Sequence, residues 1–522
     1  MQKSCHGANG RGCGLFATVA GGVPGVYDST VFVESGASIT GGAMPRNGDG
    51  VGRDRRNLTD NDRPVKCGGS ELTRFRLVVG AAILPLILLG LTALAGAARA
   101  VEKQDLVVVT SYPPSFFEPY RAAFERGHPD IRVSIVQRNT ASASRFVIEK
   151  TDVPADVFWA SATDAFELLK RNGSLRPIAP RNTGAPERVF GYPVNDPGGY
   201  YLGFALSGYG FVYNPPHLAQ NGLPVPRAWQ DLLNPVYSGQ IGITTPSRSG
   251  TTHLIVEALL QTYGWEEGWA MLSQLGGNLS TVTARSFGVA SGVAQRRFSI
   301  GITIDFLASS PDFAGAGNVF VLPPDTVFVP ASIAILSRAR NVPAAERFVD
   351  FVLSEPGQKL LLSPTIARIP VNPTLSSGLL PPEDGARLLK SGGFDAALSA
   401  RRYGLVNLMF DDYIVRRRAT LARLWKRTAD LKAMEIKDAQ RLSMLARAQG
   451  LLATPPLSTR EVENVASSLQ GEWPRGVARS PAHTDLANKL RARIEQNLAE
   501  AEGLLSAAAR PGGNVNFRPW RQ

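Results

Sequence analysis

The sequence predicts an α/β protein of two lobes that is followed by a helical C-terminal extension. Buried-type strands alternate with helical patterns from residue 105 to residue 173, and a second unit of the same kind starts at residue 228. A long extended stretch, residues 199–214, joins the two units. Strands that alternate with helices usually build a mostly parallel sheet with helices on both faces. We therefore expect such a sheet in the first unit and a second α/β unit after it.

The first unit contains three expected strands and three expected helices. The strands are "DLVVVTSY", "IRVSIVQR" and "ADVFWAS", and the helices are "SFFEPYRAAFERGHPD", residues 142–150 and "TDAFELLKRNG". Phe117, Tyr120 and Phe124 share one face of the first helix, as in a helix that packs against a sheet.

The stretch "GYYLGFALSGYGFVYN" is long, aromatic and extended, which suits a strand that leaves one lobe for the other. The second unit then has strands at "IGITT" and "IGITID", and the chain returns through "NVFVLPPDTVFVPASIAIL" and one helix, "NVPAAERFVDFVLSEPGQKLLL". The expected domains are the first lobe at 101–208 and 323–374, the second lobe at 209–322, and the helical extension at 375–522.

Small polar residues follow each strand of the first unit. They are Thr110, Ser111 and Tyr112, then Thr140, Ser142 and Ser144, then Ser161. Each one alone is explained as a helix cap. In open parallel sheets, however, ligands bind just beyond the carboxyl ends of the strands, so three groups at one sheet edge favour a ligand site.

A polar knot, defined as residues 244–252, precedes a helical stretch in "TTPSRSGTTHLIVEALL". One hydroxyl is enough to cap a helix, which is the simplest interpretation. Here Ser247, Ser249, Thr251 and Thr252 flank the flexible Gly250 at the positive end of a helix dipole, a setting that suits an anion.

Composition separates the central region from the two ends of the chain. The 522 residues are 44% apolar and carry a net charge of +12. Lys and Arg equal Asp and Glu at 22 each in residues 101–374, so the excess is +4 before this region and +8 after it. A dispersed excess without zinc-finger spacing or an aromatic RNA-binding signature does not indicate a nucleic-acid partner.

A secretory signal is expected at residues 72–100, because Arg74 and Arg76 precede an apolar run that ends in Ala98-Arg99-Ala100. Cleavage after Ala100 predicts a periplasmic protein, and an uncleaved membrane anchor is the alternative. Residues 1–71 read as a disordered leader or a mis-assigned start, with Met44 as one later initiator. All three cysteines, Cys5, Cys13 and Cys67, precede the signal, which suits export to an oxidising compartment.

Several stretches of 101–374 resemble the type II periplasmic solute-binding proteins, a family with iron(III)-, phosphoglycerate- and sugar-phosphate-binding components of ABC importers. They are "VVVTSYPPSFFEPYRAAFERGHPDIRVSIVQ", "ADVFWAS", "GYGFVYNPPHL", "AWQDLLNPVYSGQIGITTPSRSGTTH" and "FVDFVLSEPGQKLLL". The resemblance implies two lobes that are joined by hinge crossovers and close on a ligand, an ABC permease as partner, and no catalysis or cofactor.

The resemblance also implies which residues contact the ligand. In the first lobe they are Ser111, Tyr112, Ser142, Ser144, Arg145 and Ser161, and in the second lobe Ser249, Gly250, Thr251, Thr252, Ser286 and Asp305. Iron-binding relatives carry a tyrosine pair where this chain reads "ITIDFLAS", and phenolates are the ligands that ferric iron requires. Hydroxyls, helix-start amides and Arg145 instead suit a small phosphorylated or phosphonate-like anion. We therefore expect no metal at this site.

Asp305 is the one carboxylate of this set. It is expected either to accept hydrogen bonds from hydroxyl or ammonium groups of the ligand or to cap a helix.

The extension beyond residue 374 is long for a simple binding protein. Leu405, Met409, Tyr413, Leu421, Leu424 and Trp425 indicate an amphipathic helix or helix pair, and Leu486, Leu490, Ile494 and Leu498 recur four apart. Helices packed against the first lobe are the simpler interpretation, and docking to a membrane sensor kinase is the alternative. A sensory role would make the protein a ligand-dependent regulator.

An enzyme is not indicated, because the chain lacks a metalloprotease, Walker or G-x-S-x-G motif. Ser249 and His253 are the nearest approach to a nucleophile with a base, and their spacing after a helix cap reads as incidental.

Overall fold

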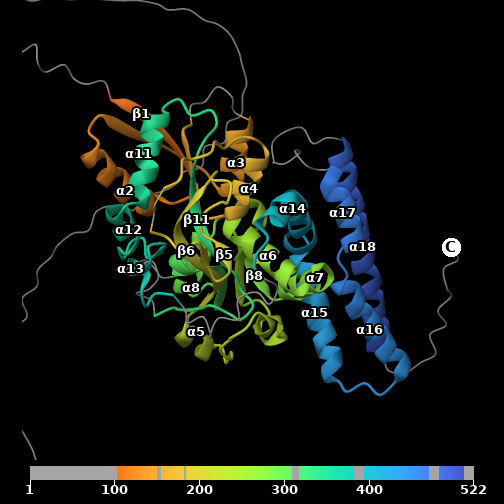
Figure 1. The fold of residues 1–522 in the computed structure, drawn as a ribbon. Helices are drawn as coiled ribbons and strands as arrows, with labels where there is room; N and C mark the ends of the chain where they lie inside the picture. The colour runs from red at the N-terminus through yellow and green to blue at the C-terminus, as the bar shows by residue number, and fades with distance from the viewer. Residues whose placement is uncertain are drawn as a thin grey trace, which may run out of the picture. The chain divides into compact units, whose positions relative to one another are not determined.

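The computed structural model describes residues 103–149, 155–181, 184–308, 317–380, 393–468 and 481–510 (Figure 1). The expected leader and signal segments lie outside the described residues. Among the residues described, no helix is long and apolar enough to cross a membrane.

The first lobe begins with the predicted alternation of strands and helices. In chain order its elements are β1 (Gln104–Thr110), α2 (Pro114–Gly127), β2 (Ile131–Gln137), α3 (Thr140–Glu149), β3 (Val157–Ala160), α4 (Thr163–Arg171), β4 (Arg188–Val189) and β5 (Tyr192–Pro193). β1 lies between β2 and β3 and pairs in parallel with both.

One long strand, β6 (Leu202–Tyr213), is buried along its whole length and belongs to both lobes. Its first half pairs with β11 (Phe328–Ile335), whereas from Tyr209 onward it pairs with β9 (Ile300–Ile304). The sheet order is therefore β2-β1-β3-β11-β6-β9-β7-β8, in one continuous path. β6 is one crossover between the lobes, and the return from β10 (Val319–Val321) to β11 is the other.

Close packing of backbone at this crossover requires glycine. A Cβ atom on Gly210 would lie 2.0 Å from the carbonyl oxygen of Val321 in β10, which no side chain permits. The glycines of "GYYLGFALSGYGFVYN" thus allow the two crossovers to lie side by side.

The second lobe consists of short helices around β7, β8 and β9. Its further elements are α5 (Pro215–Gln220), η1 (Gln230–Leu233), η2 (Pro235–Tyr237), β7 (Ile241–Thr244), η3 (Pro246–Arg248), α6 (Gly250–Tyr263), α7 (Trp265–Gly277), β8 (Leu279–Thr283), α8 (Phe287–Ala294) and α9 (Asp305–Ala308). β7 pairs in parallel with β8 and with β9, as expected for an α/β unit.

The return segment completes the first lobe with α11 (Val342–Leu353), α12 (Glu355–Leu361), β12 (Ile369–Pro370) and α13 (Pro373–Ser376). The prediction of a single helix here was wrong, because the chain forms two helices that meet at Ser354. The Ser354 side chain accepts a hydrogen bond from the Gly357 amide, and Pro356 lies in the first turn of α12. Proline has no amide hydrogen to continue α11, so the helix restarts.

The C-terminal extension is helical, as predicted. It contains α14 (Ala396–Met409), a π-helical turn η4 (Phe410–Val415), α15 (Arg418–Ala433), α16 (Ala439–Ala453), α17 (Thr459–Ser468) and α18 (Pro481–Ala509). Leu421, Leu424, Leu490, Ile494 and Leu498 are buried, which agrees with the apolar spacing in the sequence.

The expectation that the extension packs on the first lobe needs correction. α14 does pack against α4 of the first lobe, but α15 and α16 pack against α7 of the second lobe, and α18 packs against α15 and α16 (Figure 1). The reason is that α7 offers the apolar residues Trp265, Trp269 and Leu272, which these helices cover.

Candidate functional site

The polar knot leads into helix α6, and its serine caps that helix. Ser249 has an extended backbone, and its hydroxyl accepts a hydrogen bond from the Thr252 amide at 3.1 Å. The Ser249 and Ser286 hydroxyl oxygens lie 2.6 Å apart, so these two predicted residues are brought together. The capping interpretation of Ser249 is therefore correct, and a ligand role for the same hydroxyl stays a prediction.

Gly250 lies where the two lobes touch. A Cβ atom on Gly250 would lie 2.5 Å from the Cβ atom of Ala162 and 2.9 Å from the hydroxyl oxygen of Thr140, both in the first lobe. Only glycine allows this approach. The lobes are thus in direct contact at the start of α6, next to the buried side chains of Thr251 and Thr252.

The knot also contacts the C-terminal extension, which the sequence does not indicate. The carboxylate of Asp411, in the π-helical turn, accepts hydrogen bonds from the hydroxyls of Thr245 and Ser247, the latter at 3.1 Å. Asp411 is buried. Two hydroxyls of the knot therefore bind an anion that belongs to the chain itself.

The first-lobe residues at the strand ends occupy different environments. The Ser144 hydroxyl donates to the Thr140 carbonyl at 3.0 Å, and the Ser142 amide donates to the Asn139 side chain at 2.9 Å, so both residues support the start of α3. Ser161 is buried, and its carbonyl accepts from the Tyr209 hydroxyl at 3.4 Å. Ser111 and Arg145 are half-buried. A ligand role remains a prediction for each of them.

Tyr112 contacts a residue that sequence reasoning missed, Arg368. One guanidinium nitrogen of Arg368 donates to the Tyr112 hydroxyl at 2.9 Å, and another donates to the Ser207 hydroxyl at 2.7 Å. The guanidinium carbon lies 4.3 Å from the ring centroid of Phe306 in the second lobe. Arg368 thus lies where the end of β1, the crossover strand β6 and the end of β9 meet, between the two lobes.

The charge of Arg368 is deeply buried, because only 2% of the residue is accessible. Among the described residues no ion pair neutralises it, and its Nε atom is buried without a hydrogen-bond partner. The Asp305 carboxylate interacts with it electrostatically but forms no direct ion pair with it, and a buried cation without a counter-charge in contact is costly. Burial raises the pKa of Tyr112 to about 12, so this phenol keeps its proton at neutral pH and can donate it to an acceptor. A buried guanidinium beside a phenol donor is the chemistry that an anion requires, and a ligand role for Tyr112 stays a prediction.

Asp305 ties the end of β9 to the crossover strand. One carboxylate oxygen accepts from the Gly208 amide at 2.7 Å and the other accepts from the Phe306 amide at 2.7 Å. The capping alternative for Asp305 therefore agrees with its contacts. Part of the residue is accessible, but its carboxylate is enclosed, and burial raises the pKa of Asp305 to about 6 against the lowering effects of these amides and Arg368.

The raised pKa of Asp305 predicts a pH-dependent stability. The folded protein binds this proton more tightly than the unfolded chain, so the free energy of unfolding should rise as pH falls through about 6. The gain should be about 1–3 kcal/mol, since part of the residue is in contact with solvent. Urea unfolding at several pH values measures it, with Asp305→Asn as the control. If the variant and the wild type show the same pH dependence between about pH 4.5 and about pH 7, another group is responsible.

Comparisons with known proteins agree with this architecture. Residues 152–399 match the family of bacterial extracellular solute-binding proteins. The phosphoglycerate transport regulatory protein PgtC of Salmonella typhimurium is 27% identical over 365 residues, which are 69% of this chain and 88% of that protein. Iron uptake protein A1 of Synechocystis is 23% identical over 270 residues, 47% of this chain and 72% of that protein.

A solved structure shares the fold. The periplasmic binding protein AfuA from Actinobacillus pleuropneumoniae, with exogenous fructose 6-phosphate bound, has a TM-score of 0.54 and 24% identity. The alignment covers 59% of this chain and 98% of that chain. Residues 152–399 therefore resemble the bacterial extracellular solute-binding proteins, and the chain has the two-lobed fold of the periplasmic binding proteins.

Proposed function

We propose that the protein is the periplasmic substrate-binding component of an ABC importer and that it captures a small phosphorylated or phosphonate-like anion between its lobes. The observation that carries this proposal is Arg368, a buried cation between the lobes with no ion pair among the described residues. A phosphate or carboxylate on the ligand supplies a counter-charge in direct contact with the guanidinium, whose planar fork matches either group.

Two relatives support the choice of a phosphorylated ligand. PgtC is named for phosphoglycerate transport, and the AfuA structure holds fructose 6-phosphate. Both ligands combine a phosphate with hydroxyl groups. The hydroxyls of Tyr112, Ser249 and Ser286 and the carboxylate of Asp305 can hydrogen-bond such hydroxyls, while Arg368 binds the phosphate.

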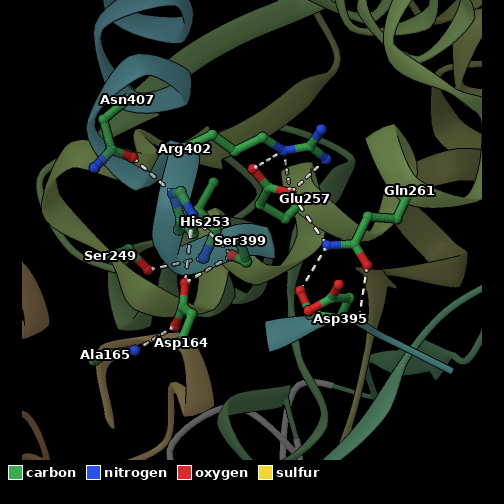
Figure 2. Close-up of polar contacts among 11 residues, drawn as sticks. Asp164, Ala165, Ser249, His253, Glu257, Gln261, Asp395, Ser399, Arg402 and Asn407 are labelled. Carbon is green, nitrogen blue, oxygen red and sulfur yellow. Dashed lines mark hydrogen bonds and ion pairs between the residues drawn. The ribbon is translucent and has the colours of Figure 1, made fainter. Parts of the chain in front are cut away.

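The contacts of His253 support binding rather than catalysis. Its ring nitrogens lie 2.8 Å from the Asn407 side-chain oxygen and 3.2 Å from the Ser399 hydroxyl (Figure 2). The Ser249 hydroxyl instead pairs with Ser286. Ser249 and His253 thus do not form a nucleophile and base pair. The predicted permease partner follows from the importer role.

A regulatory function is the second candidate. PgtC is named a regulatory protein, and the C-terminal extension of this chain contacts the polar knot through Asp411. Ligand binding that is read by a membrane histidine kinase uses the same site, so both candidates predict the same ligand class.

A ligand panel tests the proposal. The full chain is screened by thermal shift and then by isothermal titration with 3-phosphoglycerate, fructose 6-phosphate, inorganic phosphate and ferric citrate. A ligand at a hundredfold excess over its Kd should stabilise the protein by about 2.7 kcal/mol. We expect this with a phosphorylated compound. An absorption band from tyrosinate bound to iron, with no response to phosphate compounds, contradicts the proposal and favours iron(III) binding.

A further inference from the structure

Helix α14 of the C-terminal extension contacts both lobes next to the candidate site. It packs against α4 of the first lobe and against η3 and α6 of the second lobe. Binding proteins of this fold open and close about their crossovers, so the two lobes move relative to each other. A helix that contacts both lobes must release one of them when the cleft opens.

The second lobe holds α14 strongly. The Arg402 guanidinium donates to both carboxylate oxygens of Glu257 at 2.7–3.0 Å (Figure 2). The guanidinium carbon lies 5.2 Å from the ring centroid of Trp265. Glu257 is fully buried. The Asn407 side-chain oxygen lies 2.8 Å from His253 Nδ1. A buried, bidentate ion pair breaks at a high cost, so α14 moves with the second lobe.

The first lobe packs against α14 through helix α4, and the buried carboxylate of Asp164 makes a polar contact within this packing. One Asp164 oxygen lies 3.3 Å from the Ser399 hydroxyl of α14 and 3.3 Å from His253 Nε2 of the second lobe (Figure 2). Its other oxygen accepts from the amide of Ala165 at 2.9 Å. Asp164, His253 and Ser399 are all fully buried. Separation of α4 from α14 breaks the contacts of Asp164 with Ser399 and His253, whereas the contact between His253 and Ser399 stays within the second lobe and α14.

We propose that α14 is an interlobe clasp, carried by the second lobe, that engages Asp164 of the first lobe on closure and so makes the opening of the ligand cleft depend on the C-terminal extension. This inference rests on the proposed function, because a clasp has a role only where the cleft opens to admit a ligand. Through it, the extension tunes ligand affinity, and closure displaces the extension relative to the first lobe. A partner that binds the extension can therefore sense the closed state.

The test measures lobe opening without any ligand. Cys5, Cys13 and Cys67 are replaced by Ser in the full chain, and spin labels are placed at the exposed residues Ala122 of the first lobe and Ala219 of the second. Pulsed electron resonance then gives the distribution of the label distance. Ser399→Asp places a second carboxylate beside Asp164, which disfavours the closed contact. We expect a broader and longer distance distribution than in the wild type.

Ser399→Ala is the milder variant and Ser273→Ala is its matched control. Ser273 is also fully buried, and its hydroxyl donates a hydrogen bond to the Leu452 carbonyl of the extension at 2.6 Å. This contact joins the extension to the second lobe and does not involve the first lobe. Loss of the Ser399 hydroxyl should increase the open population about threefold to tenfold, and the Ser273 variant should not change it. Labels at Ala219 and Ala419, which both move with the second lobe, should keep their distance in every variant and so report intact folding.

An unchanged Ala122 to Ala219 distance in Ser399→Asp, with the Ala219 to Ala419 distance preserved, overturns the clasp. A change in both distances also overturns it, because the substitution then detaches the extension from the second lobe. The proposed function is judged separately. If no phosphorylated compound binds while Ser399→Asp still opens the lobes, the ligand assignment fails and the clasp stands.

Discussion

Replacement of Arg368 by Met is expected to weaken binding of the phosphorylated ligand by about 100-fold. The guanidinium is buried, and the residues around it, Tyr112 and Ser207, offer hydroxyls but no second positive charge. Backbone amides cannot replace that charge. Methionine fills a similar volume, so packing is kept, but the enclosed Asp305 carboxylate loses a favourable charge and some stability should be lost with it. Isothermal titration of the ligand found in the panel measures the loss.

Two further variants define what the Arg368 result means. Arg368→Lys keeps the charge but loses the planar fork, and we expect an intermediate affinity. Arg347→Met, which removes an exposed arginine that pairs with Asp130 at 2.9 Å in the same lobe, should bind as the wild type does. Unchanged affinity in Arg368→Met with a lowered melting temperature would show that Arg368 only supports the packing of β1 and β6.

Local patterns were sufficient for most of the fold. The strand and helix periodicity of the first unit was confirmed, since β1, β2, β3, α2 and α4 form where the sequence indicates them. The long aromatic stretch forms the crossover strand β6, whose residues are all buried. Its glycines, which lack a side chain, let a second strand pack closely beside it. These are properties of short segments, which a sequence displays directly.

The partners of the polar knot were beyond this kind of inference. Ser249 caps its own helix, three residues from the amide it binds, and the sequence indicated that contact. Thr245 bonds Asp411, which is 166 residues further along the chain, in a segment predicted to be an amphipathic helix. The available signal in the sequence was the pair of adjacent acids, Asp411 and Asp412, within an apolar run. The structure buries both of them. Buried carboxylates need partners, and only the tertiary structure identifies them.

Arg368 was missed for a similar reason. It stands alone in "IARIPV", between apolar residues and after a helix, where a single charge normally lies on the surface. The left-handed backbone of Ala367, with φ of 50°, helps to turn the chain toward the sheet at this point. Sequence reasoning assigned the anion to the strand ends and to Arg145, whereas the buried guanidinium comes from the return segment. The signal that could have found it is an isolated arginine in a stretch otherwise typical of the core.

The C-terminal extension contacts both the polar knot and helix α6, through η4 and α14. Asp411 accepts hydrogen bonds from the first residues of the polar knot. Arg402 and Asn407 contact helix α6, which follows the knot. The inner part of the knot faces the first lobe at Gly250. The start of α6 is therefore fixed from one side by the extension and meets the other lobe on the opposite side. If the proposed ligand site is correct, a change in the extension reaches it through one helix.

Replacement of Arg402 by Ala is expected to lower the free energy of unfolding by about 3–5 kcal/mol. Glu257 is fully buried, and loss of its bidentate partner leaves an uncompensated carboxylate between α6 and α14. The midpoint of urea unfolding, followed by circular dichroism, measures the effect. As the matched control, Arg423→Ala breaks an exposed pair with Glu502 and should cost at most about 1 kcal/mol.

A double variant separates the charge from the packing in this prediction. In Arg402→Met with Glu257→Met no charge remains buried, and apolar side chains of similar length fill the space between the helices, so stability should return close to that of the wild type. If the double variant is as unstable as Arg402→Ala, the cation contact with Trp265 and the shape of the arginine stem matter more than the ion pair. If Arg402→Ala itself loses less than about 1 kcal/mol, water reaches Glu257 readily, and α14 is not fixed to the second lobe by this pair.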